Sequence, residues 1–366
     1  MKTFALAAAV AAGAASVPAS PPQAKPRADF ERLRYAPVRT VCARAPVPLT
    51  IDGRLDEPAW KATAASSRFV DIEGDREPPL DTRMKMLWDD RFLYIAADLE
   101  EPHVWGTLKA RDSVIFQDND FEVFIDPDGD THNYYEIEIN ALGTVWDLML
   151  VRPYRDGGPA IHAWDIAGLQ SAVDVRGTLN APGDRDNGWS VEMAIPWDIL
   201  KEAAPGRAAP KPGDVWRVNF SRVQWDTEIV GGKYVKLKDP STGKPRPEHN
   251  WVWSPQGAIN MHMPERWGYL QFVGVPAGQI PPEIGGDPNE RVKWALRRLY
   301  YRQREHRAAH GRYAGDLAPL RAETIMVEGL DFRPVLSSTE SQYEIRAEGF
   351  NGAVVRIRHD GKVTVE

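Results

Sequence analysis

Residues 114–140 read VIFQDNDFEVFIDPDGDTHNYYEIEIN, and this stretch decides the fold of the sequence around it. Apolar and polar side chains alternate over 120–125 and again over 134–139, as in strands with one buried face. The intervening DPDGD at 126–130 is rich in residues that favour a tight turn. The stretch therefore predicts an antiparallel hairpin.

The register of this hairpin follows from matching its apolar faces, Ile125 with Tyr135 and Val123 with Ile137. The same register places Glu122 opposite Glu138, where like charges destabilise a sheet. We expect an arginine, a cation, a raised carboxyl pKa or a hydroxyl-rich ligand to offset the repulsion. An arginine or plain solvent would make this face structural, whereas a ligand would make it a polar binding face.

The composition narrows the fold and the partners. With 366 residues, the chain is long enough for two domains and a large core. Its 13 tryptophans and many prolines and glycines favour a mainly β fold with long loops. The net charge of -7 argues against a nucleic-acid partner. A single cysteine, Cys42, excludes an internal disulfide and a cysteine-based metal cluster.

The N-terminus has the parts of a secretory signal, which are Lys2, an apolar run over 4–15 and a small-residue cleavage point at Ala19. The run is too short to span a bilayer, and no cysteine follows it for lipid attachment. We therefore expect residues 1–19 to be a signal peptide and the mature protein to be soluble and exported, periplasmic or extracellular. Residues 20–45, with several prolines, predict a flexible lead-in.

Shorter patterns precede the hairpin. Leu49 and Ile51 predict a strand, and Pro58 predicts the first residue of a helical turn. Apolar runs over 83–88 and 92–97, separated by Asp-Asp-Arg, predict a second hairpin.

Five motifs stand in the order IDGRLDEPAW (51–60), MLWDDRFLYIAADLEEP (86–102), FQDNDFEVFID (116–126), GWSVEMAIPWDIL (188–200) and PERWGYLQF (264–272). In this order they resemble family 9 carbohydrate-binding modules, over about residues 46–273. The resemblance implies an antiparallel β-sandwich of DOMON-like type that binds plant-type polysaccharides or their chain ends. It also implies bound calcium and, often, a glycoside hydrolase partner.

The resemblance further implies a sugar site. Phe116 matches a stacking aromatic position, and Glu122 matches a glutamate that binds sugar hydroxyls. Glu138 stands where a basic residue is expected. The other candidates are Ser221 or Arg222 at a glutamine position, and Trp251 and Trp253 for a second stacking ring.

The side chains near these candidates allow two roles. Arg217 and Ser221 fall on one strand face, and Arg222 lies just beyond. They either neutralise Glu122 and Glu138 or donate hydrogen bonds to sugar hydroxyls, and the sequence leaves both roles open.

Most tryptophans are expected in the core, because Trp189 and Trp216 lie on the apolar faces of alternating runs. We expect greater exposure for those in loop-like segments, which are Trp146, Trp164, Trp225, Trp251 and Trp253. Exposed rings of this kind are platforms on which a sugar ring stacks.

Asp126, Asp128 and Asp130 form a D-x-D-x-D series with a glycine inside the loop, a pattern of oxygen ligands that suits calcium. Residue 137 is isoleucine, so the bidentate glutamate of an EF-hand is missing. The series therefore predicts either a calcium site of another kind or a solvated acidic turn.

The composition changes after residue 273. Residues 274–286 are rich in proline and glycine and predict a linker. Asp287 and Glu290 have the spacing of a helix start, and a helix over about 291–310 follows. Strand-like runs complete a small α+β appendage over 287–366, which packs against the sandwich or binds a partner.

Two other function classes remain open. A glycoside hydrolase would use two carboxylates about 5–5.5 Å apart, which Glu122 with Glu138 or Glu136 could supply. A haem-binding redox module would need an axial pair from Met84, Lys85, Met261, His262 and Met263. No spacing identifies such a pair.

Overall fold

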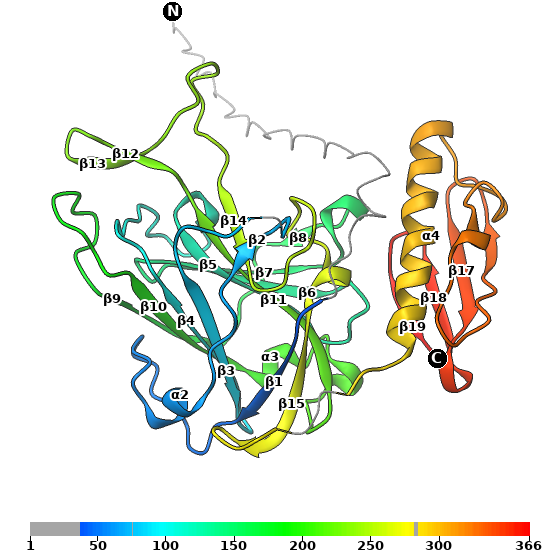
Figure 1. Cartoon of the computed structure of the whole chain (residues 1–366), viewed down its shortest axis with the longest axis horizontal. Coiled ribbons are helices and arrows are strands. Elements are labelled where there is room, and N and C mark those ends of the chain that lie inside the picture. The colour runs from blue at the N-terminus through cyan, green and yellow to red at the C-terminus, as the bar shows by residue number, and fades with distance from the viewer. Residues whose placement is uncertain (1–36, 75, 282–284) are drawn as a thin grey trace, which may run out of the picture.

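The computed structural model describes residues 37–74, 76–281 and 285–366. It shows a body of β-strands and a C-terminal part in which one long helix lies beside a small sheet (Figure 1). This architecture confirms the predicted mainly β sandwich with a small α+β appendage. The predicted signal peptide and most of the predicted lead-in lie outside the described residues.

The body has two layers of strands whose apolar faces meet in one core. The first layer has the order β8 (Ala160–Ile161), β7 (Val145–Leu150), β6 (Tyr134–Asn140), β5 (Asp120–Asp126), β11 (Val215–Gln224) and β15 (Gly268–Pro276). The second has the order β1 (Arg39–Arg44), β3 (Thr82–Trp88), β4 (Phe92–Leu99), β10 (Trp189–Pro196) and β9 (Gln170–Val175).

Shorter elements surround these layers. β15 pairs with only one end of β11. The other end pairs with β14 (His249–Val252), which in turn pairs with β2 (Val70–Asp71). A separate hairpin consists of β12 (Thr227–Val230) and β13 (Lys233–Lys236). The short helices are α2 (Pro58–Ala62), α3 (Trp197–Leu200), η1 (Ile115–Gln117), η2 (Tyr154–Asp156), η3 (Pro205–Arg207), η4 (Pro264–Arg266), η5 (Ala322–Thr324) and η6 (Phe350–Gly352).

The hairpin predicted within residues 114–140 is confirmed as β5 and β6. Ile125 lies opposite Tyr135, and Glu122 lies opposite Glu138, as expected. Val123 and Ile125 enter the core between the layers, so the apolar face has the predicted role. The second predicted hairpin is confirmed as β3 and β4.

The lead-in prediction is wrong for residues 39–44, which form β1. This strand pairs in parallel with β15 on one side and with β3 on the other, and it thereby joins the two layers. Cys42 of this strand is fully buried. The segment becomes a strand because its buried backbone N–H and C=O groups need hydrogen-bond partners, and the neighbouring strands supply them.

Leu49 and Ile51 do not form the predicted strand. They lie in an irregular segment and pack on the outer apolar side chains of the second layer. Glu192 of β10 holds the end of this segment by accepting hydrogen bonds from Asp52 N at 3.1 Å and Gly53 N at 2.9 Å. Side-chain burial, rather than strand pairing, therefore fixes the segment. Pro58 begins α2 as predicted.

The C-terminal part consists of α4 (Asn289–His310) packed on the antiparallel sheet of β16 (Val335–Ser338), β17 (Tyr343–Glu348), β18 (Val354–Arg358) and β19 (Val363–Val365) (Figure 1). Helix and sheet share their own apolar core, which includes Leu296 and Ile345. Asp287 Oδ1 accepts a hydrogen bond from Asn289 N at 2.9 Å, in keeping with the predicted helix start. No helix among the described residues is both long and apolar enough to span a membrane.

The C-terminal part packs against the body through the turn of the first hairpin. Val363 N donates to Asp130 O at 3.1 Å, and Thr131 Oγ1 donates to Gly361 O at 3.1 Å. Lys362 Nζ lies 2.7 Å from Asp130 Oδ2. The acidic turn is therefore a docking element.

A buried ion pair supports the same contact. Glu265 of η4 pairs with Arg155 at 2.8 Å and accepts a hydrogen bond from Tyr301 of α4. Burial favours the neutral acid, but the Arg155 guanidinium prevails and holds the pKa of Glu265 at about 2.

Candidate binding site

Four carboxyl groups gather on the outer face of the first layer, and we call them the acidic cluster: Asp120, Glu122, Glu136 and Glu138. Glu122 faces Glu138 across β5 and β6. Oxygen atoms of Asp120, Glu122 and Glu138 lie within 4.8 Å of one another. All four side chains are buried, so this face of the sheet is not the solvated face that alternating strands often present.

Burial changes the ionisation of the acidic cluster. It raises the pKa of Glu122 to about 7. Burial, together with repulsion from the nearby negative charge of Glu122, raises the pKa values of Asp120, Glu136 and Glu138 well above their usual range. A protonated carboxyl group both donates and accepts hydrogen bonds. Of the offsets expected for the Glu122–Glu138 pair, a raised pKa is the one that the structure supports.

Buried polar atoms in and beside the acidic cluster lack partners. Glu138 Oε2 accepts a hydrogen bond from Phe116 N at 2.8 Å, and Asp120 Oδ1 accepts one from Val223 N at 3.3 Å. Within the described part of the chain, Asp120 Oδ2 and Trp146 Nε1 have no hydrogen-bond partner. Because an unpaired buried polar group is costly, this site favours a ligand that both donates and accepts.

A cavity of about 290 Å³ covers the cluster, and we call it the acidic cavity. Phe116 of η1, Trp146 of β7 and Tyr154 of η2 form its aromatic wall. His262 also lines it, bonded through Nδ1 to Tyr134 at 3.0 Å, and burial lowers the pKa of His262 to about 3. Aromatic rings around a few fixed polar groups are typical of small-molecule sites.

The structure brings part of the predicted site together. Phe116, Glu122 and Glu138 line the acidic cavity. Ser221 lies opposite Glu122 in the pairing of β11 with β5, on the same face of the sheet. Ser221 therefore lies next to Glu122 on the outer face of the sheet, although it does not line the cavity itself.

The other predicted residues lie elsewhere. Arg222 pairs with Glu101 at 3.0 Å, and its guanidinium lies 5.0 Å from the ring of Trp251. Trp251 lines a second cavity, of about 420 Å³. Trp253 packs in the core against Phe220. The predicted set is therefore divided between two cavities and the core.

Strand geometry explains this division. Ser221 and Arg222 are neighbours on β11, and successive side chains on a strand point to opposite faces. Phe116 O accepts a hydrogen bond from Trp225 Nε1 at 2.8 Å, and Trp225 lines the second cavity. The loop that carries Phe116 therefore lies between the two cavities.

Neither candidate arginine neutralises the acidic cluster. Arg217 donates to Trp267 O at 2.7 Å and to Glu265 O at 2.9 Å, while Arg222 is bonded to Glu101. No lysine or arginine is among the described residues that line the acidic cavity. The arginine explanation for the Glu122–Glu138 pair is therefore wrong.

The exposure expected for loop tryptophans is also wrong for most of them. The exposed fraction is at most 7% for each of Trp146, Trp225, Trp251 and Trp253. Trp146, expected as a platform in an exposed loop, lies instead in β7 opposite Glu138 and lines the acidic cavity, whereas Tyr154 of the same cavity was not predicted. Continuing the strand alternation through residues 145–150 would have placed Trp146 on this face.

The predicted calcium ligands have the right chemistry but are already engaged. Oxygen atoms of Asp126, Asp128 and Asp130 lie within 4.8 Å of one another, which suits a cation that prefers oxygen ligands. Asp126 accepts two hydrogen bonds from backbone N–H groups of the turn, and Lys362 pairs with Asp130. Calcium fits this turn only if the Lys362 ammonium moves away.

The residues considered as haem ligands do not form an axial pair. Met84 lies in the core between the layers, and Lys85 donates to a backbone carbonyl at 2.6 Å. Met261 and His262 line the acidic cavity, but adjacent residues do not bind opposite faces of a haem. Met263 lies in the C-terminal core.

Comparison with known proteins shows one family and two curated relatives. The family described as "Carbohydrate family 9 binding domain-like" matches residues 51–244, just over half of the chain. An exoglucanase of Acetivibrio thermocellus is 25% identical over 165 residues, 45% of this chain and 13% of that protein. An endo-1,4-β-xylanase of Thermoanaerobacterium saccharolyticum is 25% identical over 150 residues, which are 41% of this chain and 11% of that protein. The chain thus spans only a small part of each relative.

Solved structures of low sequence identity are also similar. A family 9 carbohydrate-binding module from Caldicellulosiruptor kristjanssonii, solved with cellotriose, has a TM-score of 0.41 and 15% identity, covering 67% of this chain and 99% of that one. A putative carbohydrate-binding protein from Bacteroides uniformis has a TM-score of 0.48 and 16% identity, and the match covers 65% of this chain and 100% of that one.

Proposed function

Because this chain belongs to the carbohydrate family 9 binding domain-like family, we propose that it is an exported carbohydrate-binding protein that supports carbohydrate catabolism. Its ligand is a plant-type polysaccharide or oligosaccharide, and it occupies the acidic cavity. One sugar ring lies against Phe116, Trp146 and Tyr154, while its hydroxyls bond to Glu122 and Glu138.

The observation that carries this proposal is the unpartnered, buried Nε1 of Trp146, a residue that lines the cavity. A sugar hydroxyl accepts the hydrogen bond that this group donates. The apolar face of the same ring covers the aromatic wall. A neutral, hydroxyl-rich ligand also suits carboxyl groups whose pKa values burial raises.

A glycoside hydrolase is the second candidate, because Glu122 and Glu138 face each other as a retaining pair would. That mechanism needs one carboxyl group ionised and one protonated. With a pKa of about 7, Glu122 is partly ionised at neutral pH, while burial and the charge of Glu122 raise the pKa of Glu138 well above its usual range, so ionisation alone does not separate the two functions. The match to a carbohydrate-binding family makes binding without catalysis the function we favour.

The proposal includes export and a separate hydrolase. The signal-like residues 1–19 support export. The two curated relatives are named as polysaccharide-degrading enzymes, of which this chain spans about an eighth or less. We infer that the protein binds glycans that another enzyme degrades.

Calcium at the acidic turn is also part of the proposal. Asp126, Asp128 and Asp130 supply its oxygen ligands. The ion would stabilise the turn that carries the C-terminal part, after displacing Lys362 from Asp130.

The test is calorimetric titration of the mature protein with xylan, glucan and mannan oligosaccharides, comparing wild type with Glu122→Gln. Glu348→Gln is the matched control, since it removes an exposed carboxylate of β17. We expect binding that Glu122→Gln weakens about tenfold or more and Glu348→Gln leaves unchanged.

Chromatography of the titrated sugars separates the two candidate functions. Intact oligosaccharides agree with a binding protein, and shortened ones would establish the hydrolase instead. Absence of heat with every glycan would contradict the proposed ligand class.

A further inference from the structure

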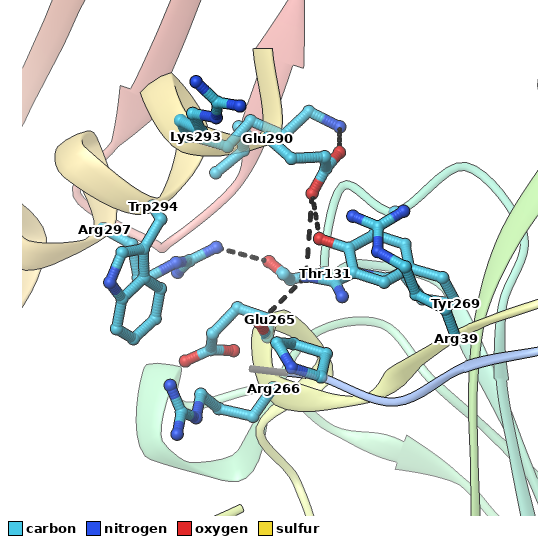
Figure 2. A pocket seen from close by; sticks show the side chains of 14 residues that line it. Arg39, Thr131, Glu265, Arg266, Tyr269, Glu290, Lys293, Trp294 and Arg297 are labelled. Carbon is cyan, nitrogen blue, oxygen red and sulfur yellow. Dashed lines mark hydrogen bonds and ion pairs between the residues drawn. The ribbon is translucent and has the colours of Figure 1, made fainter. Parts of the chain in front are cut away.

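A third cavity lies between the body and the C-terminal part, and we call it the junction cavity. Its volume is about 350 Å³. The body contributes Arg266 of η4 and Tyr269 of β15, and α4 contributes Lys293, Trp294 and Arg297. Figure 2 shows these side chains around one space, with Lys293 and Trp294 on the helix side and Arg266 and Tyr269 on the body side.

The lining of the junction cavity is strongly cationic. It contains six arginine or lysine side chains and two glutamates. Both glutamates already have partners, because Glu265 pairs with Arg155 at 2.8 Å and Glu290 pairs with Lys293 at 2.8 Å. An excess of positive charge therefore remains inside a concave, partly enclosed space, where it attracts anions.

Buried hydrogen-bond donors make this more than a charged surface. Arg297 is 1% exposed and Arg266 is 3% exposed. Among the described residues, Arg297 Nε, Arg297 Nη1 and Arg266 Nη2 have no hydrogen-bond partner. Buried guanidinium groups are normally bonded, and carboxylate and phosphate oxygens are their usual partners.

Aromatic rings form the remaining wall. Trp294 is half-buried, and the Arg266 guanidinium lies 5.0 Å from its ring. The ring of Tyr269 lies between Arg39 at 4.1 Å and Arg217 at 3.9 Å. A ligand here meets charged groups and the flat ring of Trp294, which suits an anion attached to a small organic body.

We propose that the junction cavity binds a small organic anion, with its carboxylate or phosphate group held by Arg266 and Arg297. Thr131 accepts a hydrogen bond from Arg297 Nη2 at 3.3 Å and so fixes one side of that guanidinium. Because Arg266 belongs to the body and Arg297 to α4, the ligand fastens the two parts together. This site is independent of the neutral glycan proposed for the acidic cavity.

The experiment is calorimetry and thermal unfolding of the mature full-length protein at constant ionic strength. The probes are inorganic phosphate, glucuronate as a sugar carboxylate, and glucose as the neutral control. The variants are Arg266→Gln, Arg297→Gln and Lys293→Gln, with Arg346→Gln as matched control because Arg346 is exposed on β17. Circular dichroism verifies that each variant folds, and Lys293→Gln keeps the test valid if a buried arginine is needed for folding.

We expect phosphate or glucuronate to bind and to raise the melting temperature, with the affinity lowered about tenfold or more in Arg266→Gln and Arg297→Gln. Lys293→Gln should lower it less, and Arg346→Gln should not change it. Binding of phosphate alone assigns a phosphate ligand, and binding of glucuronate alone assigns a carboxylate ligand. Lack of binding by both anions, or binding that survives all three cavity variants, would overturn the proposal whatever the neutral glycans do.

Discussion

Glu122 of β5 lies directly opposite Glu138 of β6, with both side chains buried on the outer face of the sheet. Two ionised carboxylates in this position would repel each other strongly, because little water screens them. Burial instead favours their protonated forms, so below about pH 7 the pair acts mainly as neutral donors and acceptors. We therefore expect the acidic cavity to bind its proposed ligand through hydrogen bonds more than through charge.

The first prediction concerns pH. The pKa of Glu122 is raised from 4.5 to about 7, so between these values the unfolded chain loses this proton and the folded protein keeps it. The stabilisation is complete below about pH 4.5 and is lost as the pH rises through about 7. Between pH 4.5 and pH 7, the free energy of unfolding should therefore fall by on the order of 2–3 kcal/mol more in wild type than in Glu122→Gln. Urea unfolding at several pH values measures it, and equal pH slopes in both proteins would contradict the raised pKa.

The second prediction distinguishes the two cavities. Trp146 lines the acidic cavity and Trp251 lines the second one. Trp146→Ala should weaken oligosaccharide binding about tenfold or more, because a stacking ring and a buried donor are removed. Trp251→Ala is a matched control, since both rings are almost fully buried. Calorimetry after verification of folding gives the answer, and loss of binding only in Trp251→Ala would move the ligand to the second cavity.

The third prediction concerns calcium. Lys362 Nζ lies 2.7 Å from Asp130 Oδ2, so its charge opposes a cation at the acidic turn. Lys362→Gln should bind calcium about tenfold more tightly than wild type. Lys201→Gln is the control, because Lys201 pairs with the exposed Asp198 and not with an aspartate of the acidic turn. If calorimetry finds the same calcium affinity in all three proteins, calcium does not bind at this turn.

The fourth prediction concerns the attachment of the C-terminal part. Glu265→Gln removes one of the two carboxylates paired with buried Arg155 and leaves only Asp156, at 3.4 Å, and we expect a loss of about 3 kcal/mol in unfolding free energy at neutral pH. Since the pKa of Glu265 is lowered to about 2, its stabilisation is present above about pH 4.5 and disappears as the pH falls towards 2. Denaturant unfolding at pH 7 and pH 3 measures both effects. Asp331→Asn, which breaks the exposed pair with Arg333, should change neither value.

The sequence predicted the hairpin and its register because both faces of 120–125 and 134–139 alternate and only one register matches them. It did not predict β1, since a short segment of mixed polarity becomes a strand only through partners far away in the chain. The site shows the same limit. Glu122 and Glu138 follow from local register, whereas Tyr154 and His262 reach the cavity through the packing of distant loops.

The position of β1 has a consequence for the order of folding. Its residues 39–42 pair with residues 269–272 of β15, about 230 positions later in the chain. The two layers cannot be joined until the last strand of the sandwich is available, so the closing step involves contacts of long sequence separation, which form slowly. A chain synthesised from its N-terminus therefore stays open until residues 269–272 are available to pair with β1. Until then, its unpaired strand edges are vulnerable to aggregation.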